Sequence, residues 1–278
     1  MRTYDCEPPL NDTQVLEFCK NGFLMLEGIV PAEINQRVNA YLETHTGPEP
    51  TGILLEDWFA ENVIKQPLAA GAVRSLLGPN FGLPKLMSNH RVQTPAGAQQ
   101  WHRDGGSQQS PRLNYLQVFY YPQECRLESG PTELLPGSHH IYNRSKYMAH
   151  LGQIRNTYYA AAPAGSVFLT VYSIWHRRSA STAPGLRNLL KYNYWRTTPP
   201  ARNWLAEPGF NAKGADYRME NLNMREQFRD CVDDAQMYFW LGGRADEFHV
   251  MGGQGWPTPR NYLYDVYGFP GEPTNLRD

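Results

Sequence analysis

Two histidines and one aspartate stand at positions where they could share a metal ion. His102 and Asp104 are separated by one residue, so on an extended strand both side chains would leave the same face. His176 follows much later, on what we predict to be another strand. Two imidazoles and one carboxylate on one side of a metal form the facial triad of non-haem Fe(II) oxygenases, which leaves the opposite coordination positions open. Arg187, eleven residues after His176, carries a planar guanidinium suited to a carboxylate.

The His-x-Asp pair alone is weak support for a metal site. The chain has 8 histidines, and Asp and Glu are common in it, so one such pair is expected by chance. Gly105 and Gly106 follow directly, so a strand histidine beside a turn aspartate explains the pair equally well. The surrounding sequence therefore decides between the two interpretations.

Four segments occur in the order that a known family has them. Residues 100–104 read Gln-Trp-His-Arg-Asp, residues 128–139 read Glu-Ser-Gly-Pro-Thr-Glu-Leu-Leu-Pro-Gly-Ser-His, residues 164–168 read Ala-Gly-Ser-Val-Phe, and Trp175-His176 is followed by Arg187. Together they resemble the phytanoyl-CoA dioxygenase-like (PhyH) family of Fe(II)/2-oxoglutarate-dependent oxygenases. The resemblance covers about residues 85–195, and the pattern is specific as a whole although each segment alone is not.

The resemblance implies a fold, a reaction and a set of site residues. The expected fold is mainly β with flanking helices, around a double-stranded β-helix core of jelly-roll or cupin-like type. His102, Asp104 and His176 would bind Fe(II), and Arg187 would hold the distal carboxylate of 2-oxoglutarate. O₂ would be the second cosubstrate, with release of succinate and CO₂. Related halogenases have a small residue at the position of Asp104, so the carboxylate favours hydroxylation or another oxidation of a small-molecule substrate.

Four further residues are candidates for contact with 2-oxoglutarate. Ser179 and Ser181 lie between His176 and Arg187, where the family often has small polar residues. Gln93 could reach the cosubstrate from a neighbouring strand, and Thr132 could line the pocket. The serines are otherwise plain loop hydroxyls and Thr132 a core residue, and an Asn is common in the family near position 181.

Other chemically tempting residues are interpreted structurally. His139 and His140 follow Pro-Gly-Ser, which resembles a turn of the family. Arg103 alternates away from the metal-binding face, so we expect it in a salt bridge. Arg177 and Arg178 could bind an anionic substrate, although a paired or solvated role is the simpler prediction.

Two other functions stay open beside the oxygenase. The first is a cupin-type non-haem iron oxygenase that does not use 2-oxoglutarate, against which the position of Arg187 speaks. The second is a catalytically silent binding relative, against which the complete triad speaks. No Gly-x-x-x-x-Gly-Lys, His-Glu-x-x-His or Gly-x-Ser-x-Gly segment indicates an NTPase, a zinc protease or a hydrolase.

Composition and sequence patterns limit the partners and the location that we expect for the protein. Lys and Arg number 26 against 27 Asp and Glu, and a net charge of −1 gives no electrostatic attraction to nucleic acid or to a membrane surface. The sequence shows neither a long apolar run nor a signal peptide, and its four cysteines are scattered without a Cys-x-x-Cys pair. We therefore expect a cytoplasmic monomer or homodimer.

Hydrophobic patterns predict one domain, 1–278, in three parts. Residues 1–83 are mostly helical, residues 84–200 form the jelly-roll core with a possible lid at 140–160, and residues 201–278 form a helical and loop extension. The expected helices cover residues 11–21, a stretch from Pro31, 56–65, 67–77 and 222–241. The expected strands cover residues 23–26, 85–93, 98–102, 113–121, 132–135, 165–172 and 189–195.

Overall fold

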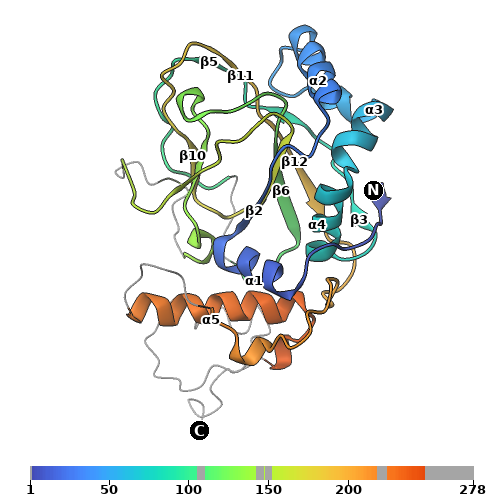
Figure 1. Ribbon diagram of the computed structural model, residues 1–278, viewed down its shortest axis with the longest axis vertical. Coiled ribbons are helices and arrows are strands. Elements are labelled where there is room, and N and C mark those ends of the chain that lie inside the picture. The colour runs from blue at the N-terminus through green and yellow to red at the C-terminus, as the bar shows by residue number, and fades with distance from the viewer. Residues whose placement is uncertain (1, 105–109, 142–146, 148–151, 218–223, 248–278) are drawn as a thin grey trace.

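A seven-stranded antiparallel sheet forms the base of the protein (Figure 1). The computed structural model describes residues 2–104, 110–141, 147, 152–217 and 224–247. The order along the sheet is β1 (Thr3–Tyr4), β3 (Phe81–Gly82), β12 (Leu190–Trp195), β6 (Tyr115–Tyr121), β9 (Ser166–Val171) and β2 (Phe23–Leu26), and β4 (Ser88–Asn89) also pairs with β12.

Two smaller antiparallel sheets complete the jelly roll. One contains β10 (His176–Arg178), β7 (Thr132–Leu134) and β8 (Tyr158–Tyr159), and the other pairs β11 (Gly185–Arg187) with β5 (Val92–Thr94). The double-stranded β-helix expected from the sequence is therefore confirmed.

Helices cover the outer face of the large sheet. They are α1 (Asp12–Asn21), α2 (Ala32–Thr44), α3 (Asp57–Phe59) and α4 (Pro67–Leu77), with the 3₁₀ turn η1 (Thr51–Leu55) and the π-helical turn η2 (Ala60–Ile64) between them. Asn11 and Gln14 form a capping box at the start of α1, and Gly22 ends that helix with φ 78°. The helices expected at 11–21, from Pro31, at 56–65 and at 67–77 are all observed, the third as α3 continued by η2.

Strand β6 separates two cores because its side chains alternate. Leu116, Val118 and Tyr120 pack toward the helices in the larger core, whereas Phe119 and Tyr121 pack toward the smaller sheets. Phe168 of β9 joins the second core and stacks on Phe119 with ring centroids 4.6 Å apart. Gln117 shares the period of Phe119, so it also faces the space between the sheets.

The C-terminal helix α5 (Met224–Leu241) runs along α1, and one buried carboxylate holds the two together (Figure 1). Asp12 of α1 is 1% exposed and accepts hydrogen bonds from Tyr238 Oη and Trp204 Nε1, both at 2.7 Å. The backbone N–H of Glu207 and the Arg202 guanidinium also donate to it. Short 3₁₀ turns lie elsewhere, as η3 (Leu127–Ser129), η4 (Ser138–His140), η5 (Ala212–Gly214) and η6 (Ala245–Glu247).

Two predicted strands are wrong in detail. Residues 85–93 give only β4 and the start of β5, separated by His90 and Arg91. Residues 98–102 are not a strand: the N–H of Gln99 bonds Arg178 O and the N–H of His102 bonds His176 O. Between these two hydrogen bonds the segment advances three residues, from 99 to 102, whereas β10 advances two, from 178 to 176. The extra residue interrupts the hydrogen-bond ladder.

The rest of the predicted organisation is partly beyond the described residues. Of the predicted lid at 140–160, residues 142–146 and 148–151 lie outside them, and Tyr158–Tyr159 form strand β8. The single domain and its three parts stay a prediction. Within the described part of the chain, no helix is long and apolar enough to cross a membrane.

Candidate metal centre

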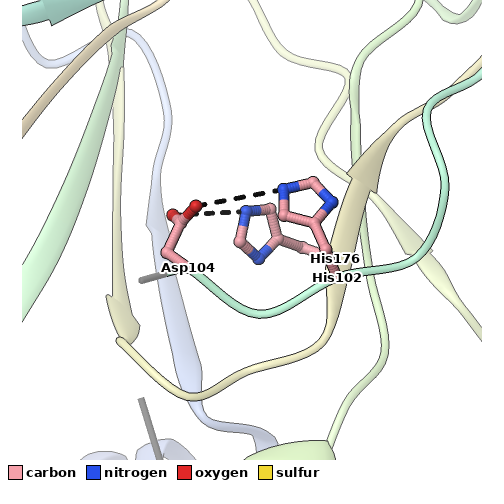
Figure 2. Close-up of side chains that lie close together, drawn as sticks. All are labelled: His102, Asp104 and His176. Carbon is pink, nitrogen blue, oxygen red and sulfur yellow. Dashed lines mark ion pairs between the residues drawn. The ribbon is translucent and has the colours of Figure 1, made fainter. Parts of the chain in front are cut away.

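His102, Asp104 and His176 meet at one point between the sheets (Figure 2). Their ligand atoms all lie within 4.8 Å of one another. His176 Nε2 lies 3.5 Å from Asp104 Oδ2, and His102 Nε2 lies 3.9 Å from Asp104 Oδ1. The structure therefore brings together all three residues predicted as ligands.

Backbone pairing places the two imidazoles side by side. The N–H of His102 donates to His176 O and the N–H of His176 donates to His102 O, both at 3.0 Å. The ring centroids are 4.5 Å apart. Asp104 reaches the same point because the chain bends after His102, so the strand alternation expected from the sequence is not the reason for its position.

Two crossed arginine–tryptophan contacts brace this pair. The segments Trp101-His102-Arg103 and Trp175-His176-Arg177 have the same residue order and run antiparallel. The guanidinium of Arg177 lies 4.7 Å from the Trp101 ring, and that of Arg103 lies 5.2 Å from the Trp175 ring. Both tryptophans are 0% exposed, so each histidine is flanked by a fixed anchor.

The imidazoles present the correct nitrogen for metal binding. His102 Nδ1 lies 2.8 Å from Gln100 O, and His176 Nδ1 lies 3.1 Å from Ile174 O. A carbonyl can only accept, so Nδ1 carries the proton and the Nε2 lone pairs face the shared point. Burial lowers the pKa of His176 to about 4 despite the Asp104 charge, which keeps this ring neutral at neutral pH.

Asp104 is held as an oriented anion. Burial alone would raise its pKa, but His176, which is protonated in the acidic range where Asp104 titrates, the charge of Lys191, and the hydrogen bonds from Gln117 and Lys191 lower it well below the usual range. Lys191 Nζ lies 3.1 Å from Oδ2, and Gln117 Nε2 donates to the same oxygen. Two imidazole nitrogens and one carboxylate on one side are the donor set that suits Fe(II).

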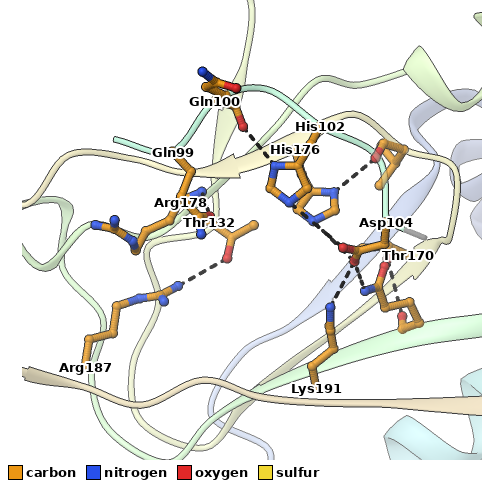
Figure 3. A network of polar contacts seen from close by, with 12 residues as sticks. Gln99, Gln100, His102, Asp104, Thr132, Thr170, His176, Arg178, Arg187 and Lys191 are labelled. Carbon is orange, nitrogen blue, oxygen red and sulfur yellow. Dashed lines mark hydrogen bonds and ion pairs between the residues drawn. The ribbon is translucent and has the colours of Figure 1, made fainter. Parts of the chain in front are cut away.

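A cavity opens beside the two histidines (Figure 3). Arg187 is 3% exposed, and its Nη2 donates to Thr132 Oγ1 at 3.2 Å. The other described residues that line it are His90, Val92, Gln99, His102, Phe119, His176, Arg177, Arg178 and Leu189. Arg187 and Thr132 thus line the same cavity as the two histidines, and their contact with 2-oxoglutarate stays a prediction.

Three residues predicted to contact the cosubstrate do not line this cavity. Gln93 is exposed and absent from the cavity lining, because β5 alternates and turns Val92 inward instead. Ser179 is buried, but its hydroxyl donates to Pro131 O at 2.9 Å. Ser181 is likewise buried, and its hydroxyl accepts from the N–H of Ala96 at 2.8 Å. Both serines fasten loops and do not line the cavity.

The structural interpretations of Arg177, His139 and His140 are confirmed. Arg177 Nε is paired with Glu133 Oε2 at 2.6 Å, as predicted. His139 and His140 lie in the turn η4, also as predicted. Arg103 packs on Trp175.

The sequence reading missed His90, Gln117 and Lys191. Gln117 interrupts the aromatic and aliphatic run of β6, and Lys191 lies between Leu190 and Tyr192 on β12. A polar residue in such a run is a usable signal for a site. His90 is in the cavity wall, where burial and then Lys191 lower its pKa to about 4.

Fold and site define the class of the protein, a double-stranded β-helix with a two-histidine, one-carboxylate centre. Residues 18–188 match the family described as phytanoyl-CoA dioxygenase (PhyH). The chain belongs to this family of Fe(II)/2-oxoglutarate-dependent oxygenases. By family it is a non-haem iron dioxygenase that uses Fe(II), 2-oxoglutarate and O₂. No curated protein sequence matches the chain.

Solved structures with the same fold are distant in sequence. HygX from Streptomyces hygroscopicus with nickel and 2-oxoglutarate bound is 15% identical, with a TM-score of 0.56 over 73% of this chain and 93% of HygX. The iron-bound form of HygX is 16% identical, with a TM-score of 0.55 over the same shares. The epimerase SnoN in complex with Fe3+, alpha ketoglutarate and nogalamycin RO is 14% identical, with a TM-score of 0.53 over 66% of this chain and 82% of SnoN.

Proposed function

We propose that His102, Asp104 and His176 bind the Fe(II) of this dioxygenase, and that Arg187 and Thr132 bind its 2-oxoglutarate. The observation that carries the proposal is the convergence of three ligand atoms within 4.8 Å beside a cavity that contains a buried arginine. That arginine distinguishes this reading from a cupin-type oxygenase without 2-oxoglutarate, which has no need of a carboxylate anchor.

Each side chain of the proposed site has its own role in binding or orienting the iron or the 2-oxoglutarate. His102 and His176 supply neutral nitrogens, and Asp104 supplies a carboxylate whose second oxygen is occupied by Gln117 and Lys191. When bound, Fe(II) couples the oxidative decarboxylation of 2-oxoglutarate to oxidation of the substrate by O₂. Arg187 offers the forked donors that a terminal carboxylate accepts, with Thr132 beside it. Phe119 and Leu189 keep that part of the cavity apolar and exclude water.

The proposed substrate is a small organic molecule of the secondary-metabolite kind, which the enzyme hydroxylates or otherwise oxidises. The nogalamycin compound held by SnoN supports a substrate of this size. Asp104 favours oxygen insertion over halogenation because a carboxylate fills the position that a halide would need. A cytoplasmic location and a monomeric or dimeric state stay predictions.

The experiment is an anaerobic titration of the metal-free protein with Fe(II) and 2-oxoglutarate, read by the weak visible charge-transfer absorption of their chelate. The wild-type protein should develop the band, and His176→Ala should not. His45→Ala, at an exposed histidine after α2, is the matched control and should behave as wild type. A full band in His176→Ala contradicts the ligand assignment. Iron binding without any band in the wild-type protein favours the oxygenase that does not use 2-oxoglutarate.

A further inference from the structure

A second arginine faces the cavity that contains Arg187. Arg178 ends β10 two residues after His176, so both lie on the same face of that strand and both line the cavity. Arg178 is paired with Thr132 in the register of β10 and β7, and Thr132 is the residue that accepts the hydrogen bond of Arg187. In Figure 3, Arg178 and Arg187 lie on the same side of the two histidines, with Thr132 near them.

No described residue that lines the cavity gives these two guanidiniums a counter-charge. Among the described residues that line the cavity none is Asp or Glu, and the third arginine, Arg177, is already paired with Glu133. Nε and Nη1 of Arg178 and Nε of Arg187 are buried without a hydrogen-bond partner among the described residues. Arg187 is buried, and Arg178 is half-buried with its Nε and Nη1 inside. Charged groups taken out of water are costly unless they are paired, so this arrangement fits an anionic ligand.

We propose that Arg178 and Arg187 jointly bind the distal carboxylate of 2-oxoglutarate, giving the enzyme a two-arginine anchor for its cosubstrate. The inference rests on the proposed function and adds a residue to it. A carboxylate has two oxygens with about four acceptor positions, enough for both guanidiniums and the Thr132 hydroxyl. An anionic group of the primary substrate is the competing occupant. The position of Arg178 opposite Thr132 favours the cosubstrate, because Thr132 already contacts Arg187.

The test compares two 2-oxo acids on the Mn(II)-loaded protein by titration calorimetry. 2-Oxoglutarate carries the distal carboxylate, and 2-oxopentanoate has the same carbon chain without it. Arg178→Gln should weaken 2-oxoglutarate binding about 10- to 100-fold, as expected for loss of hydrogen bonds to a charged group, and leave 2-oxopentanoate binding unchanged. Arg178→Lys should lie between Arg178→Gln and wild type. Arg126→Gln, at an exposed arginine, is the matched control.

Each alternative outcome has a separate meaning. Unchanged 2-oxoglutarate affinity in Arg178→Gln overturns the inference and leaves an anionic group of the primary substrate as the competing occupant. An equal loss for both acids also overturns it, because the effect is then not specific to the distal carboxylate. If the wild-type protein binds neither acid, the proposed function itself fails, whatever Arg178 does.

Discussion

Replacing Gln117 by Leu should weaken metal binding although Gln117 is not a proposed ligand. Gln117 is 0% exposed on the inner face of β6, and its amide donates to Asp104 Oδ2. One hydrogen bond to a charged group contributes about 1.5–3 kcal/mol, which corresponds to about 10- to 150-fold in affinity. Lys191 remains 3.1 Å from the same oxygen, so the loss should fall near the lower end, about tenfold.

The assay is competition for Mn(II) between the protein and a fluorescent chelator, without 2-oxoglutarate, at constant ionic strength. Thr170→Val is the matched control. Thr170 faces Gln117 across β6 and β9, and its hydroxyl lies 3.4 Å from Gln117 O, so the variant perturbs the same place without touching Asp104. A dissociation constant of Gln117→Leu within twofold of wild type would refute the orienting role. So would an equal loss in both variants, which would indicate a general disturbance of β6.

Two further predictions concern the joint between the core and the C-terminal extension. Asp12→Ala leaves several buried donors without their acceptor and should lower the free energy of unfolding by about 3–5 kcal/mol in urea titrations, whereas Asp57→Ala at an exposed position should change it by less than about 0.5 kcal/mol. For His140, burial alone would lower the pKa, but the hydrogen bond and charge of Asp234 raise it above 6.5. A raised folded-state pKa adds stability below the unfolded value that is lost as the pH rises through the folded one, so the stability advantage of wild type over His140→Gln should shrink between about pH 6 and pH 9. An advantage that stays constant or grows over this range would contradict the assignment.

Much of the fold could be predicted because its strongest local signals agree with its tertiary structure. The capping residues before α1 and the Gly after it mark a helix that the structure confirms. The β-formers of 113–121 become β6, buried on both faces between two cores. The strand predicted at 98–102 is wrong for a non-local reason. Its partner β10 lies more than seventy residues later, and the extra residue between Gln99 and His102 shows only when the two are paired.

The residues of the candidate site differ in the same way, since some are marked by local sequence and others depend on a distant partner strand. Residues inside dense motifs, such as His102 and His176, could be found because their neighbours repeat a family pattern. Gln93 was placed one position away from the inward-facing Val92, since the phase of a three-residue strand is set by its partner and not by its own sequence.

Gln117 and Lys191, which orient Asp104, are harder to predict from the sequence, and the reason is physical. Gln117 and Lys191 come from β6 and β12, paired neighbours in the large sheet, and converge on one oxygen of Asp104. Neither has a motif, because their role depends on facing inward at the right depth. The other residues on the inward face of β6 are aromatic, so a polar side chain among them would be left unsatisfied in a protein without a buried anion. A polar residue that faces inward on a central strand is therefore a pointer to the site, and here Gln117 and Lys191 both end on the carboxylate proposed to bind the iron.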